Sequence, residues 1–162
     1  MQYYSLGKQS PNVDFRMAAV TGQAPDKGLY FPTSIPNFTA AQIEKFKTLD
    51  KASLAFEVMR PYVGGTIDDE SLKNICAETI NFDFPLVPIT DTISSLELFH
   101  GPTLAFKDVG ARFMSRCLGY FSKPHQHSPQ IQNESISTLT TTTVLVATSG
   151  DTGGAVANGF LG

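Results

Sequence analysis

Cysteine, net charge and long apolar runs are all scarce in this sequence, and each scarcity excludes a class of protein. Two cysteines, Cys76 and Cys117, are too few for a disulfide framework, so we expect two reduced thiols in the core. Lys and Arg number 12 against 15 Asp and Glu, and this net charge of −3 argues against a nucleic-acid-binding protein. No apolar run approaches the roughly 18 residues of a membrane helix.

The N-terminus also lacks the basic segment and the apolar segment of a secretion signal. We therefore predict a cytoplasmic protein with no nucleic-acid or membrane partner. Its 162 residues correspond to about one domain on a scale of roughly 150 residues. The apolar stretch 155–162 has no polar tail, so we expect a helix that is cut short in a chain belonging to a longer protein.

Residues 1–85 show helical periodicity interrupted by turns, which favours a mainly helical region. Four helices are expected. Asp14 could cap the first, and Thr39 with Gln42 has the spacing of a capping box at the start of the second. The apolar stripe of Leu54, Val58 and Met59 marks the third, which should end near Pro61 and Gly64, and the fourth should begin at Thr66 or Asp68.

After residue 85 the pattern predicts strands alternating with helices. Short strands are expected at 86–89 and 95–99, a buried strand at 141–147, and a helix through Phe121 that Thr103 could cap. This order favours a parallel βαβ arrangement.

The polar segment 123–139 has no core signal. We interpret its His125 and His127 as solvated residues rather than as a metal site, because a pair without a third ligand is a weak signal.

Residues 148–154, Thr-Ser-Gly-Asp-Thr-Gly-Gly, join the last predicted strand to the last helix. Backbone N–H groups at such a junction are unpaired and the helix dipole is positive there, which is typical of a carboxylate or phosphate site. The glycine spacing fits neither a Walker loop nor a dinucleotide fingerprint. The spacing leaves open that Ser149 and Asp151 only cap the helix.

Lys107 lies in the predicted first turn of a helix whose other residues have a buried pattern. Burial disfavours an ammonium group and lowers the pKa of a lysine, which makes the amine available as a nucleophile or proton carrier. The alternative is an ordinary solvated lysine that pairs with Asp108.

Taken together, two long motifs resemble the threonine synthases, pyridoxal-phosphate enzymes of the tryptophan-synthase β-like fold. The motifs are Leu-Glu-Leu-Phe-His-Gly-Pro-Thr-Leu-Ala-Phe-Lys-Asp at 96–108 and Ala-Thr-Ser-Gly-Asp-Thr-Gly at 147–153. Segments 4–6, 20–22 and 28–32 also resemble the N-terminal part of that family.

The resemblance implies an α/β protein in two parts. Residues 1–85 would form a mainly helical N-terminal domain, and residues 86–162 the first part of a parallel-sheet domain of fold type II that binds pyridoxal 5'-phosphate. The implied reaction converts O-phospho-L-homoserine and water to L-threonine and phosphate, the last step of threonine biosynthesis. The implied enzyme is a carbon-oxygen lyase acting on phosphates, and monomer and dimer both remain open.

Carried over by position, Lys107 matches the lysine that holds the cofactor covalently and then moves protons. The residues that match the family's substrate loop are Thr148, Ser149, Asp151 and Thr152. Asp151 stands where related enzymes of the broader fold have Asn, which favours threonine synthase over a cysteine-synthase-like activity. His100, beside the lysine motif, is interpreted as a structural histidine.

The family's groups that hold the cofactor phosphate and face the pyridine nitrogen follow later in the chain, so the resemblance implies that these 162 residues alone are inactive. Two alternatives stay open. One is a pyridoxal-phosphate-dependent phospho-lyase that releases an oxo acid. The other is a non-catalytic domain that binds a phosphorylated ligand or a partner.

Overall fold

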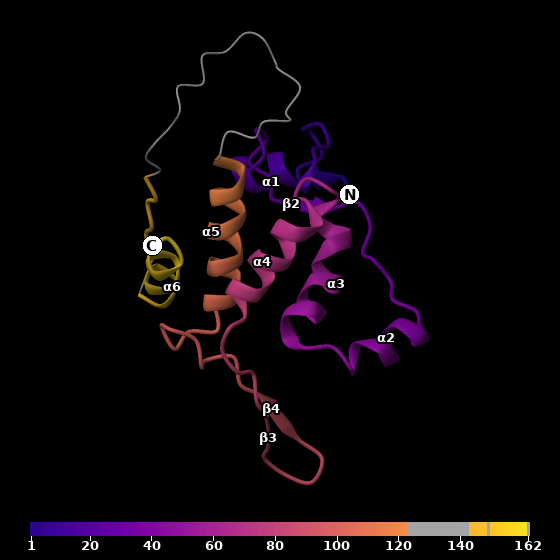
Figure 1. Ribbon diagram of the computed structural model, residues 1–162. Coiled ribbons are helices and arrows are strands. Elements are labelled where there is room, and N and C mark those ends of the chain that lie inside the picture. Colours follow the sequence, from indigo (N-terminus) through magenta and orange to yellow (C-terminus); the bar gives the residue numbers. More distant parts are fainter. Residues whose placement is uncertain (123–142, 149, 162) are drawn as a thin grey trace.

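The computed structural model describes residues 1–122, 143–148 and 150–161 (Figure 1). Within these ranges helices predominate over short strands. The helices are α1 (Phe15–Thr21), α2 (Ala40–Phe46), α3 (Lys51–Val63), α4 (Asp69–Thr79), α5 (Asp108–Ser122) and α6 (Asp151–Gly159). The strands are β1 (Tyr3–Ser5), β2 (Tyr30–Pro32), β3 (Leu86–Pro88) and β4 (Ser94–Leu96).

The first four helices begin at side chains that accept hydrogen bonds from their own first turns. Asp14 accepts from the backbone N–H of Met17 at 2.8 Å, and Asp68 accepts in the same way from Ser71 at 2.8 Å. Thr39 and the residue three positions later form the reciprocal capping box. The predicted starts at Asp14 and Thr39 are confirmed, and of the two candidates for α4 the cap is Asp68.

The end of α3 depends on a glycine rather than on the proline before it. Pro61 lies inside the helix, and Gly64 ends it with φ of 62°, a left-handed conformation that glycine adopts without steric cost. The predicted stop is therefore right for Gly64, whereas Pro61 is accommodated in the last turn.

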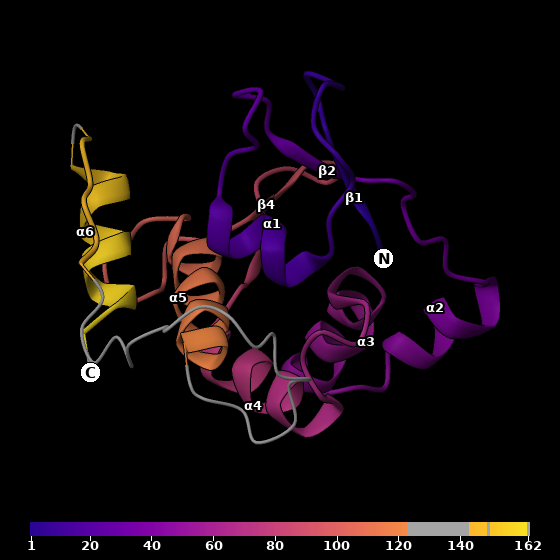
Figure 2. The same cartoon turned by 90° about the horizontal axis from the view of Figure 1, so that it is seen from above.

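The core lies where α3, α4 and α5 meet. Both cysteines are free and buried there, as predicted. The buried residues of this cluster are Phe56, Val63, Ile67, Leu72, Ile75, Cys76, Cys117 and Phe121. Figure 2 shows α1 between α5 and α3, and its Phe15 ring lies 6.1 Å from the ring of Phe121. The core thus contains residues from both sides of the predicted boundary after residue 85, and that boundary stays a prediction.

Antiparallel strands β1 and β2 hold the N-terminus against α3. Tyr3 pairs with Pro32 across the two strands, and its hydroxyl donates to the carbonyl oxygen of Tyr62 at 2.8 Å. Burial, together with the neighbouring Tyr62, raises the pKa of Tyr3 to about 12. The phenol therefore stays a neutral donor at neutral pH.

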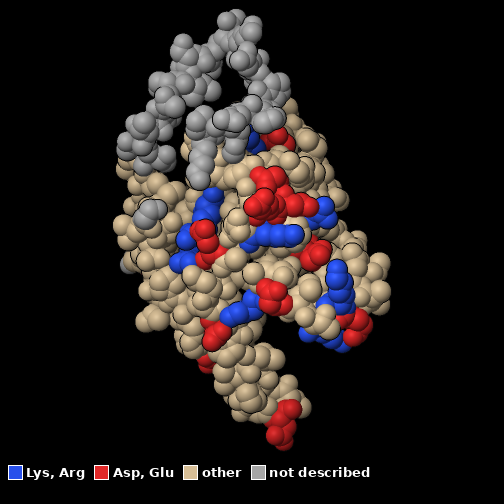
Figure 3. Space-filling model, in the orientation of Figure 1, with Lys and Arg blue, Asp and Glu red and all other residues tan. Residues whose placement is uncertain are grey.

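Strands β3 and β4 form an antiparallel hairpin that projects from the helices, with Leu86 opposite Leu96. Figure 3 shows few charged groups on it apart from an acidic group at its tip. Leu86 and Leu96 are 66% and 57% exposed. Both described sheets are antiparallel, so the parallel pairing favoured by the strand order is not formed within the described residues.

The buried strand expected at 141–147 is wrong for residues 143–147, which are irregular and exposed; Leu145 is 91% exposed. An apolar strand of this kind is stable only with hydrogen-bonded neighbours on its edges. No described strand pairs with this segment.

Helix α6 packs closely on α5. Ala155 is completely buried, and a Cβ atom on Gly159 would lie 3.1 Å from the carbonyl oxygen of Ala111. The small residues of α6 thus allow the two backbones to approach. Across the described ranges, none of the helices combines the length and apolar character needed to cross a bilayer.

Candidate functional site around Lys107

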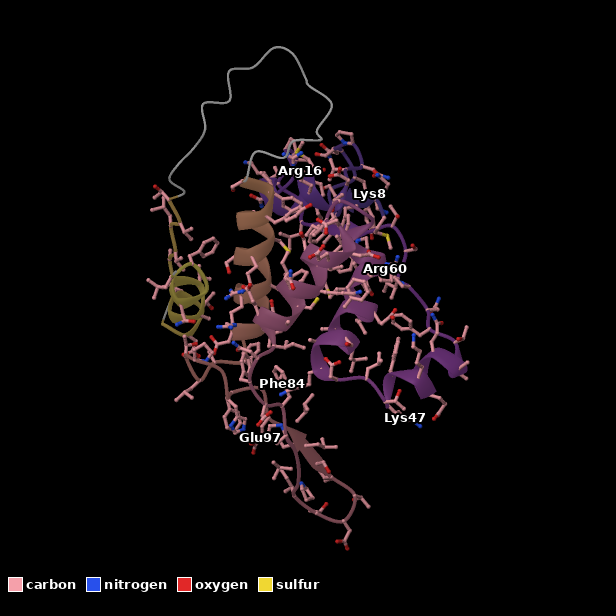
Figure 4. All side chains as sticks on the ribbon, in the orientation of Figure 1. Lys8, Arg16, Lys47, Arg60, Phe84 and Glu97 are labelled. Carbon is pink, nitrogen blue, oxygen red and sulfur yellow. The ribbon has the colours of Figure 1, made fainter. Side chains whose placement is uncertain are left out.

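The segment between β4 and α5 folds back on itself at both of its ends. At its start the backbone N–H of Glu97 donates to the carbonyl oxygen of Pro85 at 3.0 Å, and Figure 4 shows Glu97 and Phe84 at the base of the hairpin. The Nε2 atom of His100 lies 2.6 Å from Oε2 of Glu97, and its ring stacks on Phe99 at 4.8 Å between centroids. His100 thus contacts Glu97 and Phe99 of its own loop.

At the end of this segment a buried carboxylate closes a tight loop. Asp108 is completely buried, and its carboxylate accepts hydrogen bonds from the backbone N–H of Thr103 at 3.0 Å and from its hydroxyl at 2.5 Å. A methyl group on Gly101 would overlap this carboxylate. Leu104, between them, has φ of 59°, which is unusual for a residue other than glycine.

This loop corrects the expected start of the following helix. Thr103 does not cap α5, because its hydroxyl donates to a side chain five residues later and α5 begins at Asp108. Lys107 is therefore the last residue before the helix.

Lys107 is half-buried rather than fully buried, and its Nζ lies 5.4 Å from the centroid of the Phe106 ring. The alternative pairing with Asp108 is not formed: among the described residues Lys107 has no ion pair, and both Asp108 oxygens accept from Thr103. The amine is thus left beside an aromatic ring, at the edge of a hollow between two helices.

The second predicted segment leads into α6. Gly150 is the N-cap, with φ of 136°, and Asp151 is the exposed first residue of the helix, so the alternative in which Asp151 caps α6 is wrong. The backbone N–H of Gly150 donates to the hydroxyl of Thr148 at 3.4 Å, and a methyl group on Gly153 would overlap the Thr148 side chain. Ser149 lies outside the described residues.

A pocket of about 440 Å³ lies between the start of α5 and the first turns of α6. Its lining residues are Phe106, Lys107, Gly110, Ala111, Met114, Thr152, Ala155 and Val156. The structure therefore brings Lys107 and Thr152 together from distant parts of the sequence, whereas Thr148 and Asp151 are not in the lining.

Sequence reasoning missed the apolar wall of this pocket. Ala111 and Met114 follow Lys107 by four and seven residues, the spacing that places side chains on one helical face, so this periodicity could have identified them. In the described part of the chain, no group of three His, Cys, Asp or Glu side chains could hold a metal ion. His125 and His127 lie outside the described residues.

Comparison with known proteins relates the whole of this chain to one family. The family described as "Threonine synthase N terminus" matches residues 2–80. Threonine synthase from Escherichia coli K12 is 34% identical over 164 residues, covering 100% of this chain and 34% of the relative. The crystal structure of threonine synthase from Escherichia coli superposes with a TM-score of 0.83, covering 100% of this chain and 34% of that chain.

Along its whole length the chain is similar to the N-terminal third of threonine synthases. A further threonine synthase, from Buchnera aphidicola of Acyrthosiphon pisum, is 37% identical in an alignment of 163 residues that covers 100% of this chain and 35% of the relative. The chain therefore spans about a third of the length of the curated threonine synthases that it matches. The crystal structure of PLP-bound threonine synthase from Brucella melitensis has a TM-score of 0.72 and 36% identity, covering 75% of this chain and 27% of that chain.

Proposed function

We propose that this chain supplies the cofactor-holding lysine and the substrate loop of a pyridoxal-phosphate-dependent threonine synthase, a lyase that converts O-phospho-L-homoserine and water to L-threonine and phosphate. The observation that carries the proposal is that Lys107 and Thr152 line one pocket, although one precedes α5 and the other lies in α6. The names of the relatives support it, and so does the PLP bound to the threonine synthase from Brucella melitensis.

The residues of the pocket fit the ring of pyridoxal phosphate and the carbon that an amine attacks. A volume of about 440 Å³ is within the range of small-ligand sites. The wall formed by Ala111, Met114 and Val156 suits the face of a flat ring, and Lys107 is the primary amine in the described lining. No carboxylate in that lining competes for the amine.

Lys107 has two roles in this proposal. Its Nζ holds the cofactor covalently at rest, and once the substrate amine has displaced it, the free amine takes a proton from the substrate carbons and returns one. When bound, pyridoxal phosphate supplies the electron sink for the charge that builds up on those carbons. Because Lys107 is half-buried beside Phe106, its amine works at a partly water-excluded position.

The start of α6 binds the substrate. We assign this role to Thr148, Ser149, Asp151 and Thr152. The hydroxyl of Thr152 and the positive end of the helix dipole suit an anionic group of the substrate, its phosphate or carboxylate.

Trapping with borohydride tests the role of Lys107. The chain is incubated with pyridoxal phosphate, reduced and digested, and the modified lysines are mapped by mass spectrometry. We expect preferential modification of Lys107 and an absorbance band at about 410 nm before reduction. Lys107→Arg should remove this signal, whereas Lys73→Arg, at an exposed lysine beside the Phe56 ring, should retain it. Equal modification of Lys73 and Lys107 would contradict the proposal.

A chimera separates the reaction from its alternatives. Here the chain replaces the matching N-terminal third of the Escherichia coli threonine synthase, and the products from O-phosphohomoserine are analysed. We expect threonine and phosphate in equal amounts, and loss of both in Lys107→Ala. An oxo acid with the phosphate would indicate the phospho-lyase instead. Full activity of Lys107→Ala would indicate a binding domain.

A further inference from the structure

Thr103 and Asp108 lie outside the pocket, and the hydrogen bonds between them span the segment that contains Lys107. We infer that Thr103 and Asp108 are positioning residues, whose hydrogen bonds hold the backbone of Lys107 so that its amine faces the pocket beside α6. This inference rests on the role of Lys107 in the proposed function. Neither Thr103 nor Asp108 is in the pocket lining, so both would act through Lys107 rather than on the substrate.

The buried carboxylate of Asp108 is the first observation. A completely buried charged group is costly unless it is hydrogen-bonded, and here the partner for both oxygens is a single residue five positions earlier. The location at the first turn of α5 adds a favourable interaction with the helix dipole. The hydrogen bonds from Thr103 exist only while this loop keeps its shape, and the charge of Arg112 on α5 adds a favourable interaction.

Backbone hydrogen bonds on both sides of Lys107 are the second observation. The backbone N–H of Leu104 donates to the carbonyl oxygen of Gly101 at 3.1 Å, and the backbone N–H of Asp108 donates to the carbonyl oxygen of Ala105 at 3.0 Å. The carbonyl oxygen of Lys107, just before α5, accepts from the N–H of Ala111 in the first turn of that helix at 3.0 Å. Lys107 is therefore held between a closed loop and a regular helix.

The third observation is the fit between Gly101 and Asp108, which has no room for a side chain at Gly101. The left-handed backbone at Leu104 shows that the loop keeps an unfavourable conformation to make this contact. Such features persist where the surrounding contacts determine the backbone. Loss of the Thr103 hydroxyl would free the backbone of this loop and let the Lys107 amine turn away from the pocket.

The experiment compares Thr103→Val, which keeps the side-chain size but removes the hydroxyl, with Thr103→Ser, which keeps the hydroxyl. Two readouts are taken on the 162-residue chain. One is trapping of pyridoxal phosphate at Lys107 relative to Lys73. The other, without cofactor, is the pH profile of acetylation by acetic anhydride at Lys107 relative to Lys73. Circular dichroism monitors helix content.

We expect Thr103→Val to lower the trapping ratio several-fold and to alter the acetylation profile of Lys107, with helix content unchanged, and Thr103→Ser to restore both readouts. Equal readouts in the wild type and Thr103→Val would overturn the inference. If Thr103→Val does not fold, Asp108→Asn, which keeps one acceptor oxygen, replaces it with the same expectation and the same contrary outcome.

The two proposals fail differently in this experiment. If the wild-type chain shows no preference of pyridoxal phosphate for Lys107, the proposed function fails. If the acetylation profile of Lys107 still depends on the Thr103 hydroxyl, the positioning role stands without it.

Discussion

Arg112 on α5 donates a 2.5 Å hydrogen bond from its guanidinium to the carbonyl oxygen of Glu78, near the end of α4. The same guanidinium donates to the carbonyl oxygen of Thr79 at 3.2 Å and to the side chain of Asn81 at 3.0 Å. The last carbonyl groups of a helix lack partners within it and form the negative end of its dipole. A cation at this position therefore joins the two helices one turn beyond Asp108.

Replacement of Arg112 should weaken this joint. We expect Arg112→Leu to lower the free energy of unfolding by about 2 kcal/mol, because buried helix carbonyls lose hydrogen bonds to a charged donor. Urea unfolding followed by circular dichroism measures it. Arg112→Lys keeps the charge but has fewer donors, so its loss should be smaller. An unchanged midpoint in Arg112→Leu would show that water replaces these bonds.

Two glycines should respond to alanine with opposite signs. Gly101→Ala should destabilise the protein, because the added methyl group overlaps the Asp108 carboxylate. Gly119→Ala lies within α5 and meets nothing within 4 Å, so it should stabilise by about 0.5–1 kcal/mol. Thermal unfolding of both variants checks the signs, and a stabilised Gly101→Ala would contradict the arrangement of the loop.

The two core thiols should be unreactive in the folded protein. Burial raises the pKa of the Cys76 thiol to about 11 and that of the Cys117 thiol to about 12. The nearby Cys76 also raises the pKa of Cys117 by electrostatic repulsion. At pH 8 a disulfide reagent such as Ellman's reagent should label neither thiol until denaturant is added. Rapid labelling of one thiol in the native chain would mean that the core opens locally.

Asp26 should contribute to stability in acid. Hydrogen bonds from the Ser5 hydroxyl and the Gly28 backbone lower its pKa to about 2 from an ordinary value of 3.8. Because the folded pKa is the lower one, this stability is present above pH 3.8 and is lost as the pH falls toward 2. Asp26→Asn should therefore flatten the decline of the melting temperature across that interval. A parallel decline in the variant would assign the acid response to other carboxylates.

Local signals in the sequence predicted the helices well, because the side chain of a cap such as Asp14 or Thr39 accepts a hydrogen bond from a backbone N–H three residues later. Strand pairing depends on neighbours distant in sequence. For that reason the antiparallel hairpin and the irregular segment 143–147 could not be derived from apolar runs.

The candidate site shows the same division. The motif at 96–108 indicated Lys107 and the motif at 147–153 indicated Thr152, and both residues line the same pocket. Thr103 has the residue type of a helix cap, but its hydroxyl donates to Asp108 five residues later and closes a loop, which its residue type does not reveal.

The contact between Phe15 and Phe121 also bears on how the protein is made. A ribosome releases Phe15 long before Phe121, so the rings cannot meet until nearly all of α5 has left the exit tunnel. Until then the apolar faces of α1, α3 and α4 lack the helix that covers them, and the nascent chain exposes them to water. Slow codons ahead of Phe121, or within one tunnel length after it, would prolong that exposure, whereas slow codons farther downstream would not.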